Sequence, residues 1–189
     1  MTTAATTNPT ALIPVANGSE EIETVCLQDV LVRGGVHVTL ASVSGEKLVK
    51  MSRGLQVQAD TVIEECATSA FDLIVLPGGL PGANHLRDCP VLIDMLRRQK
   101  ESGKLYGAIC ASPAVVLHPH NLLIGPNATA YPAFADKVPS YSSQRVVVHD
   151  NCITSQGPAT AMEMGIELVR LLRGDEVAKT VAAGLLFAC

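Results

Sequence analysis

One cysteine of this 189-residue chain stands where enzymes place a nucleophile. Cys110 follows an apolar run at residues 105–109 and precedes Pro113, so a buried strand is expected to turn sharply into a helix there. Ala108 and Ser112, two positions to either side, are small enough for such a nucleophile elbow. We therefore predict that Cys110 projects from the end of a strand into a pocket.

The start of that helix is expected to tune the chemistry of Cys110. Pro113 suits the first helical position and Ser112 suits the cap, which leaves backbone amides pointing at the sulfur. Amides and the helix dipole favour a thiolate, and such sites lower a cysteine pKa from about 8.5 toward ~3.5 to 7.5. We expect a nucleophilic, oxidisable thiol. The alternative is a cysteine that only fills core space.

No histidine of the chain has a spacing that pairs it with Cys110. His118 lies eight positions further along the same predicted helix. At ~1.5 Å per residue it is about 12 Å away, which is too far for a hydrogen bond. The sequence therefore predicts no Cys-His dyad.

Carboxylates are better placed to serve the thiol. Glu20, Glu21 and Glu23 crowd the first turn of a predicted helix that begins at the same sheet edge. Burial would raise the pKa of one of them, so that it could hold a proton beside the sulfur and later shuttle it. Helical periodicity leaves both Glu20 and Glu23 open as that residue, and the remaining acidic residues complement the helix dipole.

The elements that must position these residues alternate along the chain. Apolar strands are predicted near residues 11–15, 36–41, 71–76, 105–109, 146–149 and 153–155. Helices are predicted near residues 20–33, 90–101, 113–118 and 159–173, with a final helical segment after Gly174 and a hairpin around residues 45–54. This order is typical of an α/β fold with a mostly parallel sheet.

Functional sites of such sheets gather at the carboxyl ends of the strands. The loop at residues 17–23, the Pro-Gly-Gly turn at residues 77–79 and Cys110 all follow strands. Gly78 and Gly79 can leave a backbone amide free opposite the sulfur, and the amide of Ala111 would complete an oxyanion hole. The alternative for Pro-Gly-Gly is an ordinary turn.

Composition excludes several classes of protein. A hydrophobic content of 48% with 17% charged residues excludes disorder, and a net charge of −4 leaves no basic footprint for nucleic acid. No apolar run approaches the ~20 residues of a membrane span, and the first residues do not resemble a signal peptide. The six cysteines form no C-x-x-C pair. We expect one cytoplasmic domain over residues 1–189, flexible at residues 1–9, without metal or cofactor.

Four ordered motifs resemble one family. They lie at residues 17–25, 76–79, 108–113 and 154–160. Together they resemble the ThiJ/PfpI superfamily, and within it the branch of the Parkinson-disease-associated protein deglycase and the bacterial YajL-type proteins. The resemblance runs from about residue 11 to residue 188. It implies a flavodoxin-like three-layer sandwich with a mostly parallel central sheet and a nucleophile elbow.

The resemblance also implies roles for particular residues. Cys110 is the expected oxidation-sensitive nucleophile, and Glu23 is the protonated glutamate that touches its sulfur. Gly79 and Ala111 would supply the oxyanion amides. The expected pocket residues are Arg53, Tyr131 and Gly78, and Tyr131 stands where the animal proteins of the branch have a histidine. Arg33 matches a residue near the dimer contact, so a homodimer is expected.

These residues lead to two hypotheses about function. In the first, Cys110 attacks methylglyoxal or glyoxal to give a hemithioacetal, and Glu23 moves the protons that yield a hydroxy acid without glutathione or metal. The resemblance extends this to deglycation of early adducts on amines and thiols. In the second, the protein is an oxidative-stress sensor or redox-regulated chaperone that uses oxidation of the same cysteine. Neither hypothesis involves nucleic acid or a membrane.

Overall fold

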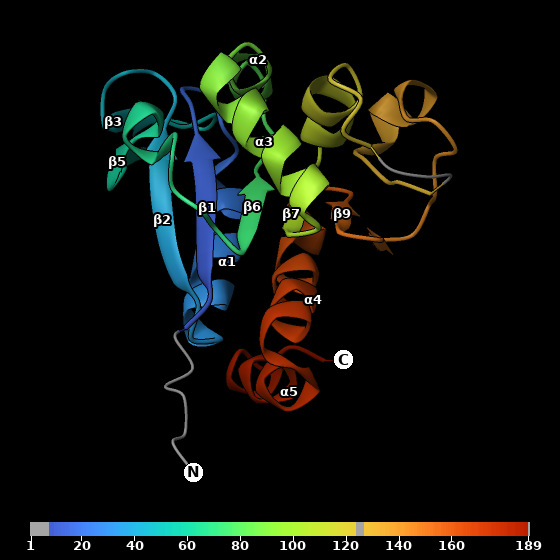
Figure 1. Ribbon diagram of the computed structural model, residues 1–189. Coiled ribbons are helices and arrows are strands. Elements are labelled where there is room, and N and C mark those ends of the chain that lie inside the picture. Colours follow the sequence, from blue (N-terminus) through green and yellow to red (C-terminus); the bar gives the residue numbers. More distant parts are fainter. Residues whose placement is uncertain (1–7, 124–126, 189) are drawn as a thin grey trace.

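The computed structural model describes residues 8–123 and 127–188, so the predicted flexible segment at residues 1–9 falls mostly outside the described residues. A seven-stranded sheet forms the centre, in the order β5-β2-β1-β6-β7-β9-β8 (Figure 1). All neighbours in it pair in parallel except β8, which runs antiparallel to β9. Its strands are β1 (Thr10–Val15), β2 (His37–Ser42), β5 (Thr61–Val62), β6 (Leu73–Leu76), β7 (Leu105–Ile109), β8 (Val146–His149) and β9 (Cys152–Ser155).

Helices cover both faces of this sheet. The α-helices are α1 (Glu21–Arg33), α2 (Gly82–Arg87), α3 (Pro90–Ser102), α4 (Ala161–Arg173) and α5 (Asp175–Gly184). Short helical turns are η1 (Ile63–Cys66), η2 (Pro113–Leu117), η3 (Pro132–Lys137) and η4 (Pro158–Thr160). The predicted hairpin is present as the antiparallel pair β3 (Leu48–Lys50) and β4 (Gln56–Gln58).

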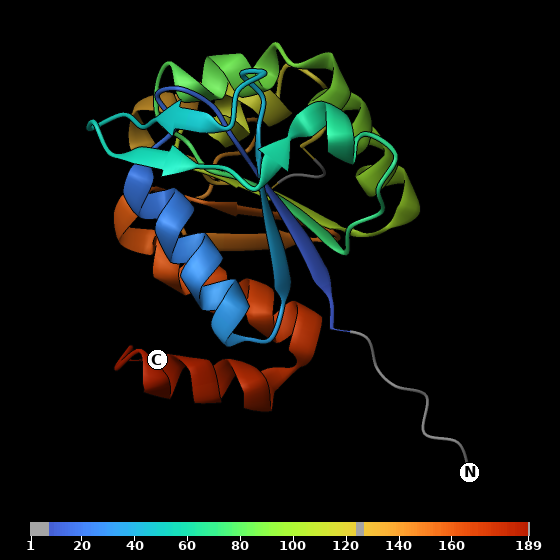
Figure 2. The same ribbon diagram turned by 90° about the vertical axis from the view of Figure 1, so that its left-hand side faces the viewer.

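The layering follows from the alternation of side chains along the buried strands. In β1, Ile13 joins a core cluster with α1, α4 and α5, whereas Leu12 joins a second cluster with α2 and α3. Figure 2 shows α1 and α4 lying together on one face of the sheet. A Cβ atom built on Gly165 would lie 2.9 Å from Val30 Cβ, so α4 packs very closely on α1. The predicted three-layer α/β architecture is confirmed.

The helix predicted at residues 113–118 is the main correction to the elements. It is one π-helical turn, η2, in which the amide of His118 donates to the carbonyl of Pro113. The expectation that Ser112 caps it is wrong, because the backbone of Ser112 is already helical and its Oγ donates to the Pro77 carbonyl at 2.6 Å. Ser112 therefore ties the cysteine turn to the neighbouring loop instead of closing a helix end.

The structure also adds elements that the sequence pattern did not predict. α2, β5 and the turns η1 and η3 are too short to leave a measurable period. Among the described residues, no helix has the length and apolar character needed to cross a membrane.

Candidate active site

Three loops meet at the carboxyl ends of β1, β6 and β7, as predicted. β1 has β2 on one side and β6 on the other, so the chain changes direction across the sheet at this point. The amide of Glu20, after β1, donates to the carbonyl of Gly78, after β6, at 3.0 Å. A Cβ atom on Gly79, whose φ is +84°, would lie 2.5 Å from the carbonyl oxygen of Gly18. Only glycine permits this close approach.

The cysteine turn has the strained geometry of an elbow. Cys110 has a φ of +64°, a conformation that non-glycine residues seldom adopt. Two backbone hydrogen bonds hold it there: its amide donates to the carbonyl of Ser155 at 3.0 Å, and its carbonyl accepts from Tyr131 at 2.8 Å. A Cβ atom on Gly78 would lie 2.6 Å from Cys110 Cβ. The side chain of Cys110 therefore sits directly above a glycine.

The three clustered glutamates have three separate roles. Glu20 caps α1, because its Oε2 accepts from the amide of Glu23 at 2.8 Å. Glu21 binds the loop between β3 and β4 by accepting from Ser52 Oγ at 2.6 Å and from the amide of Arg53 at 2.5 Å. Slight burial raises the pKa of Glu21, but these donors outweigh it and the net pKa is lowered. Only Glu23 is turned toward the cysteine.

Glu23 is fully buried beside Cys110. Its Oε2 accepts a hydrogen bond from the amide of Gly78 at 2.7 Å. Its Oε1 is also buried, and no donor among the described residues lies at normal hydrogen-bond distance and angle from it. Burial, with a smaller contribution from the negative charge of Glu20, raises the pKa of Glu23 to about 7. Hydrogen bonds from Gly78 and the Cys110 thiol only partly offset this rise. The geometry is that of a carboxyl group able to carry a proton near neutral pH.

The pKa of Cys110 moves in the direction opposite to the prediction. Burial first, and then the negative charge of Glu23 and the hydrogen bond to it, raise the pKa of Cys110 to about 12. The amides of Gly79 and Ala111 lower it by hydrogen bonding to the sulfur, as expected, but they do not prevail. Two of the raising causes require an ionised Glu23. When Glu23 carries the proton they disappear, and its O–H becomes a donor to the thiolate.

A cavity of about 340 Å³ opens over the sulfur. Its lining residues are Glu20, Ser52, Arg53, Gly79, Leu80, Cys110, Ala111, Tyr131, Phe134 and Pro158. The structure thus brings together most of the predicted site residues, including Arg53 and Tyr131. The placement of Gly78 in the pocket is wrong, because this residue lies buried beneath Cys110 with its amide bound to Glu23. Glu23 likewise lies under the cavity floor.

Several lining residues were not selected from the sequence. Leu80 directly follows Gly79, which was predicted to supply an oxyanion amide. Its position in the chain could therefore have identified Leu80 as a residue that lines the cavity. Ser52 and Phe134 come from distant loops, and no local pattern marks them, whereas Pro158 lies within the motif at residues 154–160. Arg33 lies outside the cavity and forms an exposed 2.7 Å ion pair with Asp29.

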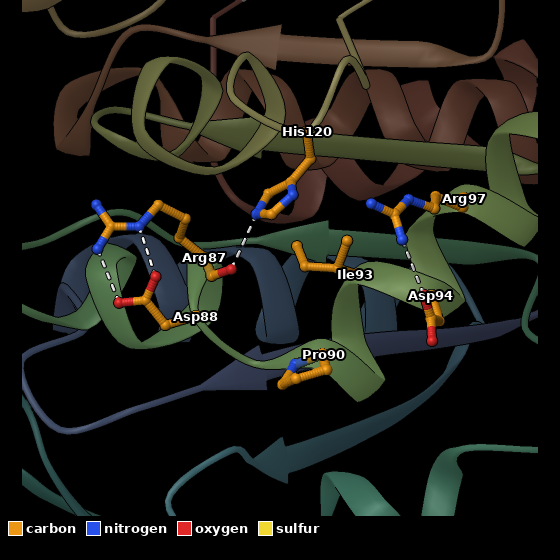
Figure 3. Close-up of a pocket in the computed structure, with 7 residues that line it drawn as sticks. All are labelled: Arg87, Asp88, Pro90, Ile93, Asp94, Arg97 and His120. Atoms are coloured by element: carbon orange, nitrogen blue, oxygen red, sulfur yellow. Dashed lines mark hydrogen bonds and ion pairs between the residues drawn. The ribbon is translucent and has the colours of Figure 1, made fainter.

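A second hollow, of about 350 Å³, lies between α2, α3 and the segment that follows η2 (Figure 3). Its two arginines are each paired with an aspartate, Arg87 with Asp88 and Arg97 with Asp94. His120 is bound to the carbonyl of Arg87 at 3.0 Å, and no cysteine lines the hollow. None of the five histidines lines the Cys110 cavity, and the described residues hold no cluster suited to a metal ion. The Cys110 cavity is therefore the candidate active site.

The fold and this site define an α/β protein in which a cysteine elbow faces a buried carboxyl group. The DJ-1/PfpI family model matches residues 9–171, and the chain belongs to the DJ-1/PfpI family. Protein DJ-1 homolog B of Arabidopsis thaliana is 45% identical over 170 residues, which are 89% of this chain. The chain spans only 39% of the length of that relative.

Two further relatives match along almost their whole length. A Caenorhabditis elegans protein named glutathione-independent glyoxalase DJR-1.2 is 38% identical over 90% of this chain and 91% of its own length. The structure of oxidized Toxoplasma gondii DJ-1 has a TM-score of 0.94 with 46% identity, and covers 96% of this chain and 100% of the other. The similarity thus includes both the overall fold and the segments that build the site.

Proposed function

We propose that this protein is a glutathione-independent glyoxalase that acts on methylglyoxal and glyoxal. One observation carries the proposal: Glu23, a fully buried carboxyl with a pKa near 7, lies against the Cys110 thiol beneath an open cavity. A nucleophile paired with a group that both gives and takes protons is what an internal proton transfer requires. The name of the Caenorhabditis elegans relative agrees with this chemistry.

With one proton on the pair, pKa values of about 12 for Cys110 and about 7 for Glu23 place that proton on the thiol, and the reaction begins when it moves to the Glu23 carboxylate. The thiolate of Cys110 attacks the aldehyde carbon, a C–S bond forms, and the carbonyl electrons move onto oxygen. The amides of Gly79 and Ala111 stabilise that oxyanion, and the Glu23 proton converts it to the hydroxyl of a hemithioacetal. Glu23 is left as a carboxylate and is ready to act as a base.

The second half moves one proton between neighbouring carbons. Glu23 takes the proton from the former aldehyde carbon, which gives an enediolate, and then returns it to the neighbouring carbonyl carbon, while the hydroxyl proton passes from the former aldehyde oxygen to the neighbouring oxygen. The product on the enzyme is a 2-hydroxyacyl thioester. Water cleaves the C–S bond, releasing lactate from methylglyoxal or glycolate from glyoxal and restoring the thiol. One water is consumed, and no oxidant, reductant or metal is required.

The same attack extends to early adducts of these aldehydes. A hemiaminal or hemithioacetal formed on an amine or thiol releases its aldehyde in equilibrium, and Cys110 would consume it. Deglycation is then an outcome of the same Cys110 and Glu23 chemistry. The width of the cavity mouth decides how large an adduct can be attacked directly.

Lactate formation from methylglyoxal by reduced protein without glutathione tests the proposal. Cys110→Ser and Glu23→Gln are each expected to lower kcat/KM by about 100-fold or more, because each removes a group that acts in the proton transfer. Cys89→Ser is the matched control, since Cys89 is half-buried but does not line the cavity. Lactate formation by the Cys110→Ser variant at the native rate would refute the mechanism.

A second candidate function is favoured by the surroundings of the sulfur. The amides of Gly79 and Ala111 that face it would also bind the oxygens of a sulfinate, and the similar structure from Toxoplasma gondii is that of the oxidized protein. Peroxide oxidises the thiolate to a sulfenate, and a second peroxide gives the sulfinate, each step releasing water. Mass spectrometry after mild peroxide is expected to find two added oxygens on Cys110 before the other cysteines. Equal oxidation of several cysteines would count against a sensor.

A further inference from the structure

The cavity over Cys110 is much larger than the proposed small substrates require. Its volume is about 340 Å³, within the range of about 300–1,000 Å³ typical of pockets for drug-sized ligands. Methylglyoxal has five non-hydrogen atoms, of which the aldehyde group must lie at the sulfur. Most of the cavity therefore remains empty when such a substrate reacts.

An apolar wall borders this extra space. Leu80, Tyr131 and Phe134 line the cavity, and two of them are large hydrophobic side chains left open, with Leu80 51% and Tyr131 45% exposed. A ligand that covers exposed apolar side chains of this size beside a nucleophile removes apolar surface from water, which favours its binding. We call these three residues the apolar wall.

Backbone contacts fix the position of the apolar wall relative to the Cys110 sulfur. Leu80 directly follows Gly79, whose amide faces the sulfur. Tyr131 donates its amide to the carbonyl of Cys110 at 2.8 Å, and its ring rests on Gly157. The amide of Phe134 donates to the Tyr131 carbonyl at 2.8 Å, and Lys137 Nζ lies 5.5 Å from the centre of the Phe134 ring. Each wall residue is thus connected to the elbow by a short path.

The charges of the cavity do not favour a charged substrate. Its lining contains one acidic residue, Glu20, and one basic residue, Arg53. The carboxylate of Glu20 is engaged by the amide of Glu23 at 2.8 Å. Discrimination between substrates therefore rests on apolar contact more than on net charge.

From the volume, the wall and its position we infer that the preferred substrates are 2-oxoaldehydes with a branched or aromatic apolar group, which the apolar wall receives. This inference rests on the proposed function. The reaction is unchanged: the aldehyde carbon bonds to sulfur, one water is consumed and a 2-hydroxy acid leaves. Leu80, Tyr131 and Phe134 are then specificity residues and take no part in the proton transfer.

The test compares 4-methyl-2-oxopentanal, which carries an isobutyl group, with methylglyoxal as substrates of the native protein. The kcat/KM for the branched substrate is expected to be at least tenfold higher, because the isobutyl group has three more carbon atoms than the methyl group and each buried carbon contributes about fourfold or more. Leu80→Ala is expected to reduce this preference about tenfold. Leu48→Ala is the control, since Leu48 is 55% exposed and lies outside the cavity.

The outcomes separate this inference from the proposed function. A preference for the branched substrate that Leu80→Ala reduces and Leu48→Ala does not supports the inference. Turnover of methylglyoxal with no preference, or with a preference that Leu80→Ala leaves intact, overturns the inference alone. Turnover of neither substrate overturns the proposed function and the inference with it.

Discussion

At the scale of single residues, the proposed chemistry depends on Glu23 and Cys110 lying side by side beneath the cavity. Burial raises the pKa of both groups, so neither is readily charged alone. A single proton on the pair lets one group carry the charge while the other donates a hydrogen bond to it. We make two predictions about the residues that hold Glu23 and Cys110 in these positions.

The first concerns the pH dependence of stability. The pKa of Glu23 rises from 4.5 to about 7 on folding. Between these values the folded protein binds more protons than the unfolded chain, so this contribution is fully present below pH 4.5 and is lost as the pH rises toward 7. The loss is on the order of 3 kcal/mol in the free energy of unfolding.

Urea unfolding of the native protein and of Glu23→Gln at several pH values measures this contribution. The variant cannot ionise at position 23, so its stability relative to the native protein is expected to increase with pH and level off above about 7. Glu176→Gln, at an exposed helix start, is the control. A stability difference that does not change with pH would contradict the raised pKa.

The second concerns the glycine under the cysteine. Gly78→Ala places a methyl group 2.6 Å from Cys110 Cβ and 3.0 Å from the amide nitrogen of Ala111. Overpacking of this kind costs about 1–3 kcal/mol, and here it must displace the elbow. Turnover is expected to fall at least tenfold, with a lower Tm. Gly184→Ala meets no neighbour within 4 Å and is expected to keep both, so equal behaviour of the two variants would show that the elbow tolerates displacement.

At the scale of elements, the hairpin β3–β4 is attached to the start of α1 and helps to form the cavity. The amide of Lys50 donates to Asn17 Oδ1 at 2.9 Å, and the amide of Ser52 donates to the Ser19 carbonyl at 2.8 Å. Glu21 adds the bonds to Ser52 and Arg53 described above. The hairpin tip, which contributes two lining residues, is therefore held by the first turn of α1.

Glu21→Ala is expected to loosen the tip of this hairpin. It removes the acceptor for Ser52 Oγ and the Arg53 amide, at a cost of about 1 kcal/mol for a partly exposed site. The KM for methylglyoxal is expected to rise several-fold, and the Arg53 amide is expected to exchange its hydrogen faster. Glu176→Ala serves as the control. An unchanged exchange rate at Arg53 would mean that Glu21 does not hold the hairpin.

At the scale of the whole molecule, the outer face of α1 exposes three apolar side chains beside the Asp29–Arg33 ion pair. Ile22, Val25 and Val32 are 52%, 48% and 53% exposed, at helical spacings that place them along one side. A stripe of this kind fits the homodimer that the family resemblance led us to expect. The dimer itself is a prediction, since the structure contains one chain.

Light scattering of the native protein is expected to give about twice the chain mass of 19.8 kDa. Val25→Asp is expected to shift the mass toward that of one chain, because it places a charge in the centre of an apolar contact. Val148→Asp, on the exposed side of β8, provides the control. A native mass of a single chain would rule out the dimer.

Much of the fold was predictable because its signals are local. Strand β7 matches its predicted bounds, and α1 and α3 match within one residue, since each has an apolar pattern with clear end signals. The helix predicted at residues 113–118 is present as a π-helical turn at Pro113–Leu117, but without the expected cap. The cap was mispredicted because the hydroxyl of Ser112 donates to the carbonyl of Pro77 in the neighbouring loop, a contact that no local pattern shows.

The sequence by itself determined the place of the cysteine and the elements that carry it, because a small-residue turn between an apolar strand and a proline depends on neighbours in the chain. Only the tertiary structure decided which glutamate faces the sulfur, which glycine amide donates a hydrogen bond to Glu23 and which side chains form the apolar wall. The direction of the Cys110 pKa also came from the tertiary structure. Burial and the charge of a residue 87 positions away outweigh the amides of Gly79 and Ala111, and neither effect is written in the residues around Cys110.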